Sequence, residues 1–130
     1  MKVLCFGTFD ILHPGHVFFL REAKKYGELS VVVALDETVM KVKGKAPRFS
    51  QEQRKANLEK LGIAGKVVLG NPGDKLKVVE DIRPDIICLG YDQQAFTKNL
   101  QAELLKRNIH CRIIRLPAFE PHKYKSSLLQ

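Results

Sequence analysis

The chain has 130 residues, of which 45% are hydrophobic, and a formal net charge of +8 at pH 7. This length suits a single domain, residues 1–130, with one compact core. No apolar run approaches the ~20 residues of a membrane span, and the N-terminus lacks the charged and long apolar segments of a secretory signal. We therefore expect a cytoplasmic protein that does not enter a membrane.

The three cysteines, Cys5, Cys88 and Cys111, lie in apolar segments and form no C-x-x-C pair. This pattern predicts reduced, buried thiols rather than disulfides, catalytic nucleophiles or metal ligands.

The positive charge indicates an anionic partner, which could be a nucleic acid, a membrane surface or a phosphorylated small molecule. The basic residues are spread along the chain except for a cluster within residues 41–48. No basic segment carries the interleaved aromatic residues that stack on bases. We favour a local phosphate pocket, and a basic nucleic-acid-binding protein is the alternative.

The first strand and the first helix are predicted to meet at a phosphate site. The run at residues 2–6, which is apolar after Lys2, suits a buried parallel strand that Gly7 ends. A proline then opens a predicted helix over about 14–26. His13 and His16 flank the start of this helix, where unpaired N–H groups and the helix dipole attract anions.

The motif GTFD at residues 7–10, followed by HPGH at residues 13–16, resembles the signature of the cytidylyltransferase-like nucleotidyltransferases. These enzymes join a nucleoside triphosphate to a phosphorylated small molecule. Within the family, the chain is most similar to archaeal FAD synthases, followed by glycerol-3-phosphate and heptose-phosphate nucleotidyltransferases. The resemblance implies that both histidines are catalytic. It also implies nucleotide contacts from Thr8, Phe9, Asp10, His13 and His16.

A second buried strand is predicted over Leu29–Leu35, followed by Asp36 at its carboxyl end. Asp36 could contact a substrate hydroxyl, because ligands bind at this end of parallel strands. A helix-capping or turn role explains the same residue equally well.

Residues 39–49 combine glycine, proline and dense positive charge without sustained helical periodicity, which predicts a mobile loop and a candidate lid. The family resemblance implies that Lys41 is catalytic and that Lys43 and Lys45 bind substrate phosphates. A basic loop that only faces water is the alternative.

The sequence SQEQ at residues 50–53 is a capping box, which predicts a helix from Gln51 to just before Gly62. Arg54 lies off the apolar stripe of this helix. The resemblance implies that Arg54 contacts the nucleotide and takes part in catalysis, whereas an exposed ion pair is the ordinary explanation of such a residue.

A third strand over 67–69, a helix over about 75–82 and a fourth strand over 86–89 follow. The segment LGYDQ at 89–93 is the part that most resembles archaeal FAD synthases. There Gly90 lets a ligand approach the backbone. Asp92 could accept a hydrogen bond from a ribose hydroxyl, hold a metal-bound water or cap the next helix.

That next helix is predicted over about 94–107 and a fifth strand over 111–116. The closing segment resembles the family's triphosphate-binding motif, in which a serine or threonine pair lies at a helix N-terminus. Ser126 and Ser127 match this pair, which implies nucleotide binding. The family's preceding arginine and Gly-Ile are absent.

Alternating strands and helices predict an α/β fold with a Rossmann-like, doubly wound, five-stranded parallel sheet in one domain. The ligand crevice is expected at the ends of the first and fourth strands. Neither a dinucleotide-binding G-x-G-x-x-G nor a P-loop is present.

We therefore predict a nucleotidyltransferase (EC 2.7.7 type) that transfers a nucleoside monophosphate from ATP or CTP to a phosphorylated acceptor and releases pyrophosphate. The favoured reaction is FMN plus ATP to FAD. Glycerol-3-phosphate cytidylyltransferase, a heptose- or sugar-phosphate nucleotidyltransferase and a catalytically inactive nucleotide-binding module are the alternatives. Mg²⁺ is expected to accompany the triphosphate without a dedicated set of protein ligands. A homodimer is expected from the family.

Overall fold

The computed structural model describes residues 1–90 and 99–117. Its strands are β1 (Lys2–Gly7), β2 (Glu28–Val33), β3 (Lys66–Leu69), β4 (Ile86–Leu89) and β5 (Arg112–Arg115). Its helices are α1 (Pro14–Lys24), α2 (Asp36–Lys43), α3 (Gln51–Leu61), α4 (Lys77–Ile82) and α5 (Leu100–Lys106). None of these helices is long and apolar enough to cross a membrane.

The strands of the described residues form one parallel sheet in the order β3-β2-β1-β4-β5. Cys5 in the middle of β1 pairs with Val31 of β2 on one side and with Cys88 of β4 on the other. The order of strands reverses between β1 and β4, which is the position where doubly wound sheets bind ligands. The predicted α/β class and the parallel sheet are confirmed.

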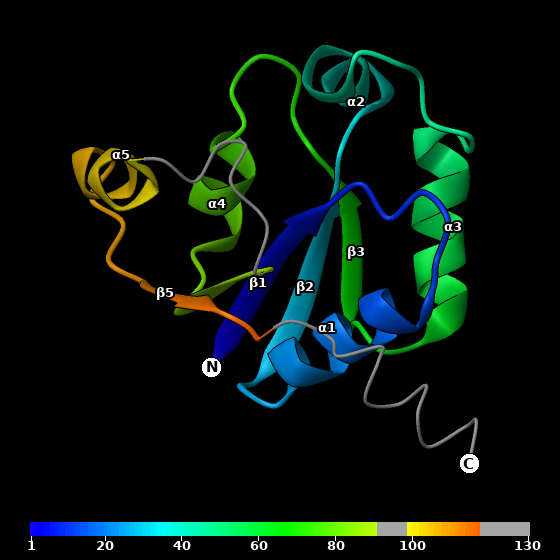
Figure 1. Ribbon diagram of the computed structural model, residues 1–130. Coiled ribbons are helices and arrows are strands. Elements are labelled where there is room, and N and C mark those ends of the chain that lie inside the picture. Colours follow the sequence, from blue (N-terminus) through cyan, green and yellow to red (C-terminus); the bar gives the residue numbers. More distant parts are fainter. Residues whose placement is uncertain (91–98, 118–130) are drawn as a thin grey trace.

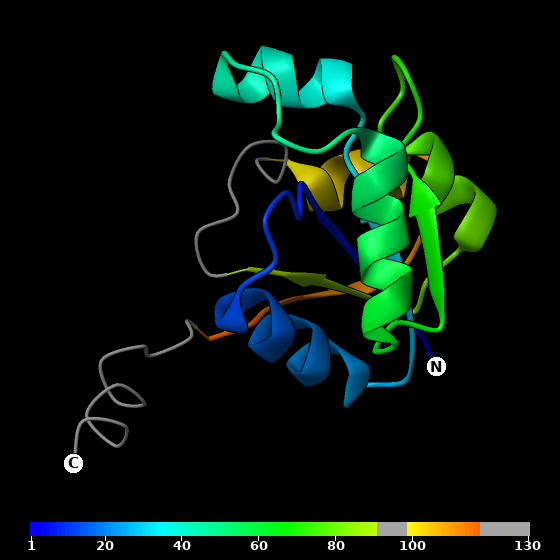
Figure 2. The ribbon, with the colours of Figure 1, turned by 90° about the vertical axis from the view of Figure 1, so that its right-hand side faces the viewer.

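Helices cover both faces of the sheet (Figures 1 and 2). On one face, Val3 and Cys5 of β1 belong to a core cluster with residues of α1 and α3. On the other face, Leu4 and Phe6 belong to a second cluster with residues of α4 and α5. Because both faces are covered, the central strand β4 and residues 3–6 of β1 are continuously apolar and buried, as the sequence predicted.

Helix α2 lies beyond the carboxyl edge of the sheet, at the top of Figure 1. The prediction of a loop over residues 39–49 was wrong for its first part, because the helix continues to Lys43. Acidic residues in its first turn and lysines in its last turn both suit the helix dipole. Gly44, at a φ of 75°, then ends the helix. This short helix has a single buried residue, Val39, so it lacks apolar periodicity. Its dense charge and the nearby glycine and proline indicated a loop instead.

Other boundaries differ by a few residues. Helix α1 ends at Lys24 rather than near Tyr26, and α4 begins at Lys77 rather than at 75. The predicted helix over 94–107 is wrong at Asn99, whose φ of 65° is left-handed, so that α5 begins at Leu100 and ends at Lys106. Residues 91–98 lie outside the described residues.

The three cysteines are buried and unbridged, as predicted. Burial raises the pKa of the Cys88 thiol to about 11 and also raises the pKa of Cys5 and Cys111. Thiols with raised pKa values are poor nucleophiles at neutral pH.

Candidate active site

Two histidines form the start of α1. His13 is the N-cap residue, and its Nδ1 accepts a hydrogen bond from the backbone N–H of Gly15 at 3.0 Å. His16 reaches back, and its Nδ1 accepts from the N–H of His13 at 3.3 Å. The two rings stack with centroids 3.9 Å apart. The pair therefore forms a capping box made of imidazoles instead of the usual serine and glutamate.

This capping box reduces the number of backbone N–H groups at the start of α1 that can bind an anion. The N–H of Gly15 is bonded to His13 Nδ1, and the N–H groups of His16 and Val17 are bonded to the His13 carbonyl. The expectation that these N–H groups are free to bind phosphate is therefore wrong for this turn. The available donors are the Nε2 atoms, since each Nδ1 acts as an acceptor and a neutral ring then carries its proton on Nε2.

The environment of His16 disfavours its charged form. Burial, followed by electrostatic interactions with His13 and Lys43, lowers the pKa of His16 from 6.5 to about 4. At pH 7 the His16 ring is therefore neutral, and Nε2 can donate a hydrogen bond to a phosphate oxygen without carrying a full charge.

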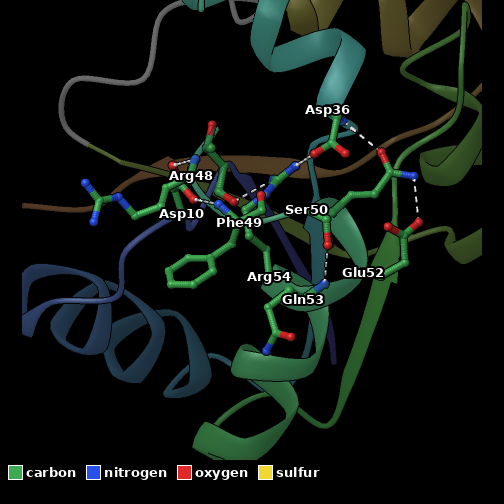
Figure 3. A network of polar contacts seen from close by, with 10 residues as sticks. Asp10, Asp36, Arg48, Phe49, Ser50, Glu52, Gln53 and Arg54 are labelled. Carbon is green, nitrogen blue, oxygen red and sulfur yellow. Dashed lines mark hydrogen bonds and ion pairs between the residues drawn. The ribbon is translucent and has the colours of Figure 1, made fainter. Parts of the chain in front are cut away.

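We call residues 13–16 the histidine turn. Asp10, which precedes this turn, binds the segment before α3 (Figure 3). Its Oδ2 accepts from the N–H of Arg48 at 2.7 Å, and its Oδ1 accepts from the N–H of Phe49 at 2.9 Å. Desolvation acts to raise the pKa of Asp10, but these two N–H groups and the charges of Arg54 and Lys43 outweigh it and lower the pKa. Both carboxylate oxygens are thus engaged with backbone.

Arg54 is completely buried, at 0% exposure, so the prediction that it lies off the buried side of its helix was wrong. Its guanidinium donates to the carbonyls of Phe49 at 3.0 Å and Thr8 at 2.9 Å, and to Asp36 Oδ1 at 2.7 Å. Apolar periodicity could not reveal this, because an arginine is buried only where tertiary partners satisfy its donors. A direct contact between Arg54 and a nucleotide stays a prediction.

Asp36 is the first residue of α2 and does not cap it, since the N-cap is Leu35 without a side-chain bond. The Asp36 carboxylate pairs with Arg54, and its N–H donates to Gln51 Oε1 at 2.8 Å. We call Asp10, Asp36, Gln51 and Arg54 the Arg54 network. It joins the loop after β1, the start of α2 and the start of α3 (Figure 3).

The Ser50 capping box is only half formed. Ser50 Oγ accepts from the N–H of Gln53 at 3.1 Å, as predicted. The Gln53 amide, however, donates to Asn57 at 2.8 Å instead of returning to Ser50.

A family model described as cytidylyltransferase-like matches residues 4–130. The chain belongs to the cytidylyltransferase-like family. It is 48% identical over 120 residues to a FAD synthase of Aciduliprofundum boonei, and the matched region covers 92% of this chain and 80% of that protein. It is 46% identical over 117 residues to a FAD synthase of Methanosarcina barkeri, covering 89% and 83%. Among solved structures, a lipopolysaccharide core biosynthesis protein of Thermoplasma volcanium GSS1 is 41% identical, with a TM-score of 0.87 and coverage of 92% and 98%.

Two of the three lysines predicted to bind phosphates lie on α2, and the third follows it. Lys41 and Lys43 belong to its last turn, Lys45 follows Gly44, and all three are exposed. Within the described residues, none of the three forms an ion pair. Lys43 is the lysine whose charge acts on both His16 and Asp10. The structure therefore places Lys43 where its charge acts on His16 and Asp10.

The remaining predicted site residues of this cytidylyltransferase-like chain either follow β4 or lie outside the described residues. Gly90 follows β4, directly beside β1, and its carbonyl accepts from Arg115 at 2.7 Å. Asp92, Ser126 and Ser127 lie outside the described residues, so their predicted nucleotide contacts stay predictions.

The sequence did not single out Gln51 as a partner of Asp36 or the backbone of residues 48 and 49 as the partner of Asp10. Main-chain donors carry no residue signature, so only the folded structure reveals them.

Proposed function

We propose that this chain catalyses transfer of AMP from ATP to FMN, forming FAD and pyrophosphate. The observation that carries the proposal is the stacked pair His13 and His16 at the start of α1, at the carboxyl end of β1 and beside β4. A parallel sheet binds ligands at this switch point. The names of the relatives in A. boonei and M. barkeri support FMN and ATP as substrates.

The reaction is an in-line displacement. An oxygen of the FMN phosphate attacks the α-phosphorus of ATP, and the bond from that phosphorus to the oxygen bridging to the β-phosphate breaks. The electron pair leaves with pyrophosphate. Because no proton must be removed from an ionised phosphate, catalysis depends on alignment and on stabilising negative charge.

Histidine and lysine side chains of this chain stabilise the negative charge on the phosphates. His13 and His16 donate from Nε2 to phosphate oxygens, and Lys41 neutralises the triphosphate. Lys43 and Lys45 bind the phosphate of the acceptor, and Asp36 remains a candidate for a substrate hydroxyl through the oxygen that Arg54 does not use. Arg54 acts on catalysis mainly by holding Thr8 and Asp36 in place. Thr8, Asp10, Gly90, Asp92, Ser126 and Ser127 complete the proposed nucleotide site, whereas the ring of Phe9 is buried against His16.

A divalent cation is expected with the triphosphate. Within the described residues, no group of three His, Cys, Asp or Glu side chains could hold a metal ion, and both oxygens of Asp10 are engaged with N–H groups. We propose that Mg²⁺ binds chiefly through the phosphate oxygens of the triphosphate, as this ion usually does. When bound, Mg²⁺ would supply charge neutralisation to the phosphates.

The decisive experiment measures pyrophosphate release with ATP and with CTP, each combined with FMN, glycerol 3-phosphate or a sugar phosphate. FAD is identified by chromatography. We expect turnover with FMN and ATP. Turnover of glycerol 3-phosphate with CTP, without any turnover of FMN, would overturn the proposed substrates. Binding of ATP without turnover of any acceptor would indicate an inactive binding module.

The homodimer and the cytoplasmic location stay predictions. Sedimentation at micromolar concentration tests the first, and a monomer at every concentration would contradict it.

A further inference from the structure

The backbone of Phe9 adopts an unusual conformation next to the histidine pair. Its φ of 51° lies in the left-handed region that bulky side chains rarely adopt. Arg83, Asn99 and Asn108 also have positive φ. Arg83 is the C-cap of α4, where a left-handed residue is common, and asparagine tolerates this region through its short polar side chain. An aromatic residue in this conformation must be held by its surroundings, and strained backbone of this kind clusters at functional sites.

The Phe9 side chain is 4% exposed and packs between two groups of the site. On one side is Gly7, where an added Cβ would lie 2.5 Å from Cε2 and 2.8 Å from Cζ of Phe9. On the other side is His16, whose ring centroid lies 5.4 Å from that of Phe9 at an interplanar angle of 59°. The ring of Phe9 therefore fills the space between the end of β1 and His16, and only glycine at position 7 leaves room for it.

We propose that Gly7 and Phe9 form a wedge that presses the His16 ring against His13 and keeps Nδ1 of His16 on the His13 N–H, so that Nε2 alone faces the substrate. Phe9 is then a positioning residue for His16. The nucleotide contact that its motif implies is not needed for this role. That Nε2 of His16 faces the substrate rests on the proposed function, whereas the orientation of the His16 ring by the wedge does not.

The wedge also accounts for the electrostatic state of His16. Burial is the largest cause of the lowered pKa of His16, and the Phe9 ring is one of the groups that pack against the His16 ring. The charged and titratable groups that act with it are His13 on the same turn and Lys43 on α2. All three effects disfavour the imidazolium, so removal of the ring should raise the pKa of His16 toward 6.5.

The test uses Phe9→Leu and Gly7→Ala in the full chain. The first substitution removes the ring, and the second displaces it with an added Cβ. NMR titration of the histidine Cε1–H signals, with the His16 signal assigned by its loss in His16→Gln, measures the midpoint for His16. We expect both variants to raise this midpoint by about one pH unit. A folded variant with an unchanged midpoint would overturn the proposal.

Val79→Ala provides the control for simple loss of stability, because Val79 is fully buried in the cluster on the opposite face of the sheet. We expect this variant to leave the midpoint of His16 unchanged. Should Phe9→Leu fail to fold, Gly7→Ala decides the question by the same measurement.

A kinetic measurement completes the test. Phe9→Leu should lower kcat for FAD formation about tenfold and change KM for ATP by less than about twofold, because the wedge orients a group that acts on the transition state. If the parent protein forms no FAD, the proposed function fails, but the titration still decides whether the wedge exists. Equal losses in Phe9→Leu and Val79→Ala, with the same midpoint for His16, would show that Phe9 has only a structural role.

Discussion

The histidine turn and the Arg54 network lie at the same edge of the sheet, but they are assembled over different distances along the chain. The side-chain hydrogen bonds of the turn join residues two or three positions apart. Arg54 joins groups that are 5, 18 and 46 positions away. The turn can therefore form wherever its helix begins, whereas the network exists only after β1, α2 and α3 have packed together. Under the proposed function, the histidine turn contains residues that contact the reacting phosphates, and the Arg54 network contains residues that hold neighbouring segments in place.

The largest expected effect is that of His16→Ala on turnover. Loss of one donor to a charged transition state lowers kcat by ~10²–10³. Since His16 is half-buried at the first turn of α1, the fold should survive. Pyrophosphate release measures the rate, and circular dichroism checks folding. His110→Ala, at an exposed histidine just before β5, is the matched control and should keep the parent rate. Parental activity in His16→Ala would contradict the phosphate role.

Arg54→Met tests the other region and should act first on stability. It removes three hydrogen bonds from a buried guanidinium, and we expect a loss of about 1.5–3 kcal/mol in the free energy of unfolding. Urea titration measures this loss. Lys60→Met, on the exposed side of α3, is the control and should change stability little. A variant as stable as the parent would show that the network does not hold the three segments together.

Lys43→Ala tests whether α2 acts electrostatically on the histidine turn. We expect kcat/KM to fall about tenfold, a change of ~1.4 kcal/mol, because one positive charge near the phosphates is lost. The same substitution at Lys45 is the comparison and should have a smaller effect, since only Lys43 acts on both His16 and Asp10. Equal losses of kcat/KM in Lys43→Ala and Lys45→Ala would show that the placement of Lys43 on α2 gives it no special effect on the histidine turn.

Asp10→Asn should have the smallest effect, about 1 kcal/mol in stability at pH 7, because an amide can accept only one of the two N–H bonds without reorientation. The folded-state pKa of Asp10 is lowered from 3.8, so its stabilisation is complete above about pH 4 and is lost as pH falls through the lowered pKa.

Urea unfolding at pH 7 and at pH 3 should therefore show a smaller difference between the parent and Asp10→Asn at the lower pH. Asp81→Asn, in an exposed pair with Lys77, is the control. A difference between parent and Asp10→Asn that stays constant with pH would exclude the proposed role of the carboxylate.

Much of this protein follows from the sequence by itself. Continuous apolar strands determine a parallel sheet covered on both faces, because only doubly buried strands can lack polar alternation. The proline and two histidines after Gly7 determine where α1 begins and which side chains lie there, since caps are built from neighbouring residues. The order of motifs was sufficient to recognise the cytidylyltransferase-like family.

Only the tertiary structure decided how Arg54, Asp10 and Phe9 are used. Arg54 is buried although it is charged, because carbonyls and a carboxylate from three segments meet around it. Asp10 is engaged by main-chain N–H groups almost forty positions away, and Phe9 is held at a positive φ beside His16. These contacts are invisible in the sequence, because hydrogen bonding to backbone and packing against a distant ring depend on which segments the fold brings together.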